Sequence, residues 1–453
     1  MEERTLAHLC TLFENDGCPP QVKDSIVTGI CTDTRRVERG ELFIPFRGER
    51  VDGHDYIETA LYSGCTASLS EHAIPNQPVV AVKDTRRALL QLAEGYRREF
   101  SPLMCAVTGS VGKTTLKEMI ASVFGTTFQT LKTAGNFNNE IGLPLTVLRL
   151  ERDTQACVLE MGMSNAGEIS RLVRVARPHI AVVNNVGVAH IENLGSREAI
   201  RDAKLEILEG LDADGHIILN ADEPLLCEKL CEIGPRAMTF GMENGKADVY
   251  CTAYESVEGG SRATVRHPEG ETKIFVPAAG RHNVSNALAA FAAGLAAGIS
   301  PENIAKGIAA FTNTGMRQNI YSRDGVTVIE DCYNANPQSM RAALSVLDES
   351  KGLRKVAVLG TMRELGAIAP CEHCEIGSMA AGIAEELVFC GKNAEDYARG
   401  ARAAGCDRAR IHVCRDAAEA GAAAKELRRA GDVLLFKGSR GEKMEEAIRA
   451  IFE

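Results

Sequence analysis

Short apolar runs alternate with amphipathic stretches along most of this chain. The runs lack the regular polar positions of a strand that faces water, which is typical of a parallel sheet covered on both faces. One series lies at residues 103–107, 156–161, 180–184 and 216–220, and a second at 326–330, 355–359, 386–390 and 433–437. Segments between them repeat apolar residues at helical spacing, so we predict an α/β fold.

The length of 453 residues and the breaks in this pattern predict three domains. Residues 1–100 read as a small mixed α/β domain that ends in an amphipathic helix at 85–100. Residues 101–313 are expected to form a central parallel-sheet domain, interrupted by an antiparallel patch with strands at 248–254, 262–267 and 272–276. Residues 314–453 repeat the alternation and are expected to form a Rossmann-like domain.

Composition and charge exclude several classes of protein. The 51 basic and 61 acidic side chains give a net charge of −10, which disfavours a nucleic-acid partner. No apolar segment reaches the roughly 18 residues that span a bilayer, and the N-terminus lacks the apolar core of a signal peptide. We therefore expect a cytoplasmic protein without a membrane span, and the 15 cysteines are expected to be reduced. Residues 371–374, CEHC, have no second pair at metal-ligand spacing, so we expect no zinc.

The strongest chemical signal is the segment LMCAVTGSVGKTTL at 103–116. Its glycines permit a tight turn whose amides, with the positive end of the following helix, form a cradle for phosphate oxygens. Lys113 can reach the outer phosphates of a nucleotide, and the Thr114 hydroxyl suits Mg²⁺. The general P-loop pattern has glycine where this chain has Val107, which disfavours ordinary P-loop kinases and GTPases. The predicted nucleotide-binding residues are Gly109, Ser110, Val111, Gly112, Lys113, Thr114 and Thr115.

Three further side chains are candidates for a metal site. Glu160 ends one predicted strand and His190 follows the next, so both reach the edge where ligands bind in open α/β sheets. The alternatives are an acid that caps a helix and a structural histidine. Lys204 lies in the apolar face of a predicted helix at 196–211. It either snorkels to water or points at the metal site, where a lowered pKa would let it form a carbamate with CO₂; the residues alone leave both open.

Two polar loops are weaker candidates. The segment AGNFNNEIGLP at 134–144 is dense in asparagine, and DCYNANPQSM at 331–340 follows a predicted strand. Each is either a turn-rich loop or part of a site. In the second interpretation the first loop is a polar wall beside the phosphates, and Asp331, Tyr333 and Asn334 form a hydrogen-bonding loop of the size of a ribose or base.

A series of motifs spans nearly the whole chain in the order TGSVGKTT, AGNFNNEIGLP, NNVGVAHIENLGS, AKLEI, GRHNVSNALAA, DCYNANPQSM, VLGTMRELG and FKGSRGEKME. In this order they resemble the Mur ligase superfamily, whose members use ATP to join amino acids or peptides to carboxylates. YNANP and NNEIG are most similar to the members that add D-alanyl-D-alanine to a UDP-muramyl tripeptide. CTDTRR and GERVDGH resemble the uridine-nucleotide-binding domain, and the Asp-Asn-Pro-Arg motif of the diaminopimelate-adding members is absent.

The resemblance implies a cell-wall precursor ligase whose substrates are ATP, UDP-N-acetylmuramoyl-tripeptide and D-alanyl-D-alanine; we expect a monomer. It implies one Mg²⁺ on Thr114 and Glu160, and a second on Glu160, His190 and carbamylated Lys204, with Lys113 holding the outer phosphates. The implied ATP contacts from elsewhere in the chain are Asn286, Arg317, Asp331, Tyr333 and Asn334. The implied substrate contacts are Thr32, Asp33, Thr34, Arg35, Gly48, Asp52, His54, Asn136, Asn138, Asn139 and Glu140.

Two alternatives stay open at this point. One is another Mur ligase or a folylpolyglutamate-type ligase, which would share the phosphate loop. The other, from a different class, is a P-loop nucleotide switch without ligase activity, which would hydrolyse ATP slowly whether or not a muramyl peptide is present.

Overall fold

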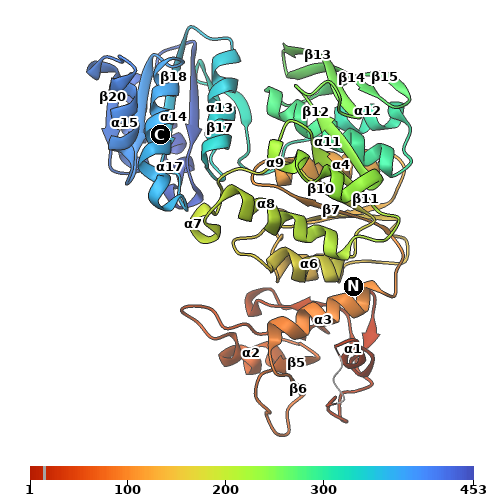
Figure 1. Cartoon of the computed structure of the whole chain (residues 1–453). Helices are drawn as coiled ribbons and strands as arrows, with labels where there is room; N and C mark the ends of the chain where they lie inside the picture. The colour runs from red at the N-terminus through yellow and green to blue at the C-terminus, as the bar shows by residue number, and fades with distance from the viewer. Residues whose placement is uncertain (14–16) are drawn as a thin grey trace.

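Sheets of four, nine and six strands follow one another along the chain, besides a two-stranded sheet near the N-terminus, in a computed structural model that describes residues 1–13 and 17–453 (Figure 1). The four-stranded sheet is parallel, and the two larger sheets are mostly parallel with antiparallel strands at one edge. The predicted α/β class is therefore confirmed. Among the described residues, no helix combines the length and the apolar character needed to cross a membrane.

The first sheet is small and lies beside three helices. Its strands run in the order β3 (Ile30–Cys31), β4 (Leu42–Phe43), β5 (Ala67–Ser70) and β6 (Val79–Ala81), and β1 (Arg4–Thr5) pairs separately with β2 (Ile26–Val27). The helices are α1 (Leu6–Leu12), α2 (Ile57–Tyr62) and α3 (Thr85–Arg97). Asp84 caps α3 by accepting a hydrogen bond from the Arg87 amide. The buried face of α3 belongs to an apolar cluster that continues into the central part of the chain, and Figure 1 shows α3 beside α6 (Glu168–Ala176).

The central sheet has nine strands in the order β15-β14-β13-β12-β11-β10-β7-β9-β8. Their bounds are β7 (Leu103–Thr108), β8 (Thr130–Lys132), β9 (Ala156–Glu160), β10 (Ile180–Val183), β11 (His216–Asn220), β12 (Ala237–Gly241), β13 (Val249–Val257), β14 (Gly260–His267) and β15 (Gly270–Val276). The three antiparallel strands lie where the sequence predicted them, and they extend this sheet at one edge. They join it through β12, which pairs in parallel with β11 and with β13 and was not predicted, because its first three residues are only half-buried.

Helices cover both faces of the central sheet. On one face, α4 (Lys113–Phe124), α11 (Arg281–Ala296) and α12 (Pro301–Ala309) pack in a cluster that takes Cys105 and Val107 from β7. The opposite face contributes Met104 and Ala106 to the other cluster, with α5 (Gly142–Val147), α6 and α8 (Arg197–Leu205). Alternate residues of one strand thus serve both layers, which is why the run is apolar throughout.

The predicted helix at 196–211 ends earlier than expected. α8 stops at Leu205, and a 3₁₀ segment, Glu206–Gly210, follows it. The Glu206 carboxylate accepts hydrogen bonds from the amides of Gly167 and Ser170 at the start of α6. A Cβ at Gly210 would lie 2.6 Å from the carbonyl oxygen of Val173, so this close approach requires glycine.

The third sheet has the order β16-β17-β21-β18-β19-β20, and its strands are β16 (Asn319–Arg323), β17 (Val326–Asp331), β18 (Arg354–Gly360), β19 (Glu386–Cys390), β20 (Ile411–Cys414) and β21 (Asp432–Lys437). Five helices pack around it: α13 (Pro337–Glu349), α14 (Ala369–Ala381), α15 (Ala394–Ala403), α16 (Ala417–Leu427) and α17 (Met444–Phe452). The four predicted strands form its centre. The two edge strands, β16 and β20, were not predicted because most of their side chains are exposed or half-buried.

Candidate functional site

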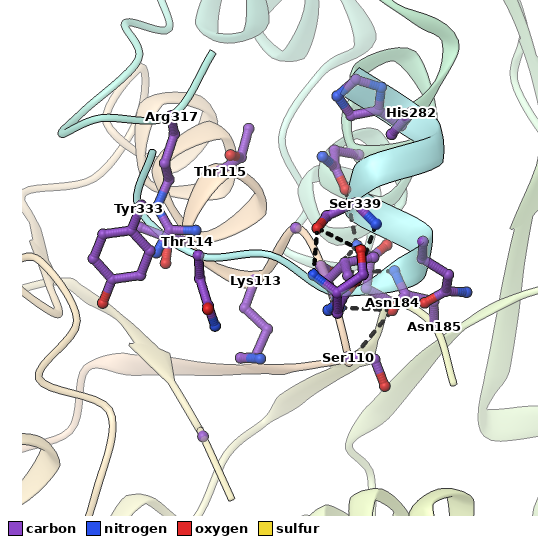
Figure 2. Close-up of a pocket in the computed structure, with 18 of the residues that line it drawn as sticks. Ser110, Lys113, Thr114, Thr115, Asn184, Asn185, His282, Arg317, Tyr333 and Ser339 are labelled. Atoms are coloured by element: carbon purple, nitrogen blue, oxygen red, sulfur yellow. Dashed lines mark hydrogen bonds between the residues drawn. The ribbon is translucent and has the colours of Figure 1, made fainter. Parts of the chain in front are cut away.

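A cavity of about 710 Å³ lies where the carboxyl ends of the central strands face the third sheet. Its walls come from the phosphate loop after β7, the asparagine-rich loop, the ends of β9, β10 and β11, helix α11, and residues 313–343. In Figure 2, Arg317 and Tyr333 lie on one side, Ser110, Asn184 and Asn185 lie on the other, and Lys113 is between them. Side chains from distant parts of the chain thus meet in one space.

The phosphate loop is shaped by two asparagines at the end of β10. The amides of Ser110 and Val111 donate to Asn185 Oδ1 at 3.0 and 2.9 Å. Gly112 has φ +76°, and a Cβ there would lie within 3.0 Å of amide atoms of Asn184 and Asn286. Asn184 and Asn185 were missed as site residues, although NNVG directly after a predicted strand was a usable signal.

Lys113 begins α4 and folds back over the loop. Its Nζ donates to the Gly109 carbonyl at 2.7 Å. Burial lowers the pKa of this ammonium, and the Glu160 carboxylate acts in the opposite direction. Thr114 and Thr115 line the same cavity, so the predicted loop residues from Ser110 to Thr115 are all brought together.

Glu160 presents a carboxylate oxygen that is free to bind a cation. Its side chain is 1% exposed, and Oε1 accepts a hydrogen bond of 2.7 Å from Asn138 Nδ2. Oε2 is buried without a hydrogen-bond partner in the described part of the chain. A buried carboxylate oxygen without a partner is costly. The site therefore suits a hard cation such as Mg²⁺, and Thr114 lines the same cavity.

His190 lies in the cavity wall, and its ring contacts a loop of the third domain. It has φ +64°, and its Nδ1 is 2.8 Å from Glu364 Oε2, in the loop after β18. This contact lowers the pKa of the Glu364 carboxyl.

Lys204 is buried and is not among the residues that line the cavity, so the structure does not bring it together with Glu160 and His190 there. Its side chain is 2% exposed, so snorkelling does not explain its place in the apolar face. Burial, and secondly the charge of Lys113, lower the pKa of its ammonium well below the ordinary value. Within residues 1–13 and 17–453, no carboxylate lies at ion-pair distance from it. Lowering the pKa of an amine increases its deprotonated fraction, which is the form that reacts with CO₂.

The other predicted nucleotide contacts also line the cavity. Asn286 Oδ1 accepts a hydrogen bond from Asn184 Nδ2 at 2.8 Å. The Arg317 guanidinium lies 3.9 Å from the centre of the Tyr333 ring, and Asn334 lies beside them. Asp331 pairs with Lys437 Nζ at 2.6 Å.

His282 and Lys437 were missed. Both line the cavity, and burial lowers the pKa of His282 to about 4. The sequence offered a signal for each, since His282 lies in GRHNVSN and Lys437 begins KGSR.

The asparagine-rich loop is divided between the cavity and the surface. Asn136, Asn138 and Asn139 line the cavity. Asn139 also accepts hydrogen bonds from the amides of Ile141 and Gly142, at 3.1 and 2.9 Å, at the start of α5. Glu140 is outside the lining and pairs with Arg171.

The predicted uridine-nucleotide residues lie away from this cavity, beside the first sheet. Asp33 caps the 3₁₀ turn Thr34–Arg36, and its hydrogen bonds with the Arg35 side chain and amide lower its pKa to about 2. Asp52 accepts hydrogen bonds of 2.9 and 2.6 Å from the amide and Nδ1 of His54. Thr32 precedes the first of these turns, and Gly48 precedes the second.

We expect at most substoichiometric zinc in protein purified without added metal. Cys371 and Cys374 lie on α14, where the ring of the intervening His373 is buried. Its Nε2 accepts a hydrogen bond of 2.9 Å from the Met362 amide, and its Nδ1 lies 2.6 Å from the Ala369 carbonyl, so both ring nitrogens are engaged. Elemental analysis measures this. One equivalent of zinc that is lost in Cys374→Ser would contradict it.

Three family models match successive parts of the chain. They are described as Mur ligase family, catalytic domain, at residues 26–97; Mur ligase middle domain, at residues 107–294; and Mur ligase, glutamate ligase domain, at residues 316–440.

Individual relatives match over nearly the full length. A Bacillus subtilis protein named UDP-N-acetylmuramoyl-tripeptide–D-alanyl-D-alanine ligase is 41% identical, over 100% of this chain and 99% of that protein. A crystal structure of MurF from Acinetobacter baumannii has a TM-score of 0.91 at 31% identity and covers 100% of this chain and 99% of its own. The MurF ligase of Thermotoga maritima, in complex with ADP, has a TM-score of 0.84 at 27% identity and covers 93% and 96%.

Proposed function

The chain belongs to the Mur ligase family, and on that premise we propose that it adds D-alanyl-D-alanine to UDP-N-acetylmuramoyl-tripeptide. The other substrate is ATP, and the products are UDP-muramyl-pentapeptide, ADP and phosphate, so the reaction belongs to cell-wall precursor synthesis. The observation that carries the proposal is the single cavity that joins a phosphate loop, a carboxylate oxygen without a partner and polar side chains from the third sheet. The name of the Bacillus subtilis relative supports the choice of substrates.

The chemistry explains why such a cavity is needed. A carboxylate does not accept an amine at neutral pH, because its leaving group would be oxide. A carboxylate oxygen of the tripeptide therefore attacks the γ-phosphorus of ATP, and ADP leaves, which gives an acyl phosphate. The amine of the dipeptide then attacks the acyl carbon, loses a proton and expels phosphate. Because anions meet in the first step, positive groups must surround them: Lys113 and the loop amides are placed for this role.

We infer that the enzyme uses two Mg²⁺ ions. Thr114 and Glu160 would hold one ion, and Glu160, His190 and carbamylated Lys204 the second; bound there, the ions would neutralise charge on the phosphates. The fit rests on Glu160 Oε2, which has no partner among the described residues. His190 would have to exchange its contact with Glu364 for the ion.

The other proposed ATP contacts come from residues that line the cavity. Adenine would lie near Asn286, and Arg317, Asp331, Tyr333 and Asn334 would reach ATP from the third domain, in keeping with the ADP of the Thermotoga neighbour.

We assign residues 1–100 to the UDP-binding domain, 101–313 to the ATP-binding domain and 314–453 to the C-terminal domain. In the first, Thr32, Asp33, Thr34, Arg35, Gly48, Asp52 and His54 would line the uridine-diphosphate site. Asn136, Asn138, Asn139 and Glu140 would lie near the muramyl peptide, in a monomeric cytoplasmic enzyme.

Closure of the third domain would protect the acyl phosphate. Residues that line the cavity come from both the central and the third domains, so water would be excluded when the two approach each other.

Lys204 is expected to carry a carbamate in the active protein, because its buried amine has a lowered pKa and no counter-ion among the described residues. Labelling with ¹³C-bicarbonate should give a carbamate resonance that is lost in Lys204→Met. Lys229→Met, which removes a half-buried lysine paired with Glu232, should keep it. A free ammonium at Lys204 in protein with bound metal and substrates would contradict this prediction.

Phosphate release tests the proposed function. Rapid release should require ATP, UDP-muramyl-tripeptide and D-alanyl-D-alanine together, and single D-alanine should be a far poorer acceptor, because binding two residues places the amine near the acyl carbon. Slow hydrolysis that ignores the muramyl peptide would favour a nucleotide switch. Turnover with a folate or another peptide acceptor would favour a different ligase of the superfamily.

A further inference from the structure

Lys117 is a second lysine of the phosphate helix, and it is fully buried. It follows Lys113 by four residues, so it lies one turn further along the same side of α4. Its side chain is 0% exposed and is absent from the lining of the cavity. Its Nζ donates to the carbonyl oxygens of Thr133 at 2.7 Å and Gly135 at 3.4 Å.

A charge in this position needs a reason. Burying an ammonium is costly unless it is paired and hydrogen-bonded, and an apolar side chain would fill the same space. The charge is balanced by Glu118, whose Oε1 lies 2.6 Å from Lys117 Nζ and which also pairs with Lys132. Lys117 directs its hydrogen bonds to the backbone at the beginning of the asparagine-rich loop.

Thr133, which directly precedes the loop, and Asn138 within it hold Glu160 at two points. The hydroxyl of Thr133 accepts a hydrogen bond of 3.0 Å from the Glu160 amide, and the Thr133 amide donates to the Val158 carbonyl at 3.0 Å. Further along, Asn138 Nδ2 donates to Glu160 Oε1 at 2.7 Å. The Asn138 carbonyl accepts a hydrogen bond of 2.9 Å from the Gly162 amide. The loop therefore fixes the backbone of Glu160 and occupies one of its carboxylate oxygens, which leaves the other for the cavity.

We propose that Lys117 is a positioning residue for the metal-binding carboxylate: it fixes residues 133–135 to the phosphate helix, and through Thr133 and Asn138 it orients Glu160 Oε2 toward the cavity. This inference rests on the proposed metal role of Glu160. Lys117 thus connects the helix of the phosphate loop to the residues that hold Glu160, so the phosphate loop and the metal ligand keep a fixed position relative to each other. Partners that orient a metal ligand commonly change metal affinity by about 10- to 100-fold when they are removed.

The test is Mn²⁺ binding, as a probe for Mg²⁺, to the full chain with and without ADP, followed by electron paramagnetic resonance. Lys117→Met should weaken Mn²⁺ binding in the presence of ADP by about tenfold or more. Binding of ADP without metal should change by less than about twofold, because Lys117 is outside the cavity. The matched control is Lys132→Met, which removes the other cation of Glu118 but makes no hydrogen bond to the loop, and it should bind Mn²⁺ like the unchanged protein.

Two further variants decide the matter if Lys117→Met does not fold. Lys117→Met combined with Glu118→Gln removes both buried charges together, and Thr133→Val removes only the hydroxyl that holds the Glu160 amide. Each should weaken Mn²⁺ binding in the same way. Folded variants that bind Mn²⁺ as tightly as the unchanged protein would overturn the inference. If the unchanged protein and Glu160→Gln bind Mn²⁺ equally, the proposed metal role of Glu160 fails instead.

Discussion

Lys113→Ala is expected to lower turnover by a factor of about 10² or more, because it removes a positive charge from the place where the γ-phosphate meets the attacking carboxylate. In this structure the Lys113 ammonium donates to Gly109 and lines the cavity, close enough to Glu160 for the carboxylate to affect its pKa. Nucleotide affinity should fall less than turnover, because the loop amides and the walls of the cavity remain.

The measurement is the rate of ADP formation with all three substrates, together with ADP binding by calorimetry. Lys229→Ala is the control, because this half-buried lysine pairs with the exposed Glu232 and is not in the cavity lining, and its turnover should stay within about twofold. A Lys113→Ala protein that forms the acyl phosphate at a near-normal rate would remove Lys113 from the chemistry.

Glu160→Gln is expected to have a comparable effect, a loss of about 10² or more in turnover. Glutamine keeps an oxygen that can accept the hydrogen bond from Asn138, so the local structure should survive. The negative charge that balances a divalent cation is lost. Raising the Mg²⁺ concentration should restore part of the rate if the defect is in binding of the ion.

Turnover as a function of Mg²⁺ concentration measures this effect. The control is Glu232→Gln, which removes a surface carboxylate of the same type. If Glu160→Gln shows the Mg²⁺ dependence of the unchanged protein and loses little turnover, Glu160 does not hold the metal.

The fold was predictable where burial makes the pattern unambiguous. The strands around Val107, Val158 and Val182 are apolar on both faces because helices cover both faces, and they were found in the correct places. Edge strands failed for the opposite reason. β16 and β20 have too many exposed or half-buried residues to form an apolar run, and β12 was missed because its first three residues are half-buried.

The candidate site was predictable where chemistry is local in sequence. The phosphate loop carries its own signature, and Glu160 and His190 were placed by the ends of their strands. The relations between loops were not predictable. Nothing local shows that Asn185 accepts the hydrogen bonds of two phosphate-loop amides, or that His190 contacts Glu364, about 170 residues further along the chain. Such contacts depend on tertiary packing, which the spacing of apolar residues along the chain does not reveal.

The most direct test of the proposed reaction follows the oxygen atoms of the tripeptide. If its terminal carboxylate is labelled with ¹⁸O in both positions and the reaction is run with ATP and D-alanyl-D-alanine, an acyl phosphate requires one labelled oxygen to leave with phosphorus. Mass spectrometry should therefore find one ¹⁸O in each released phosphate and one in the new amide. Released phosphate without label, at normal pentapeptide yield, would contradict the acyl-phosphate mechanism.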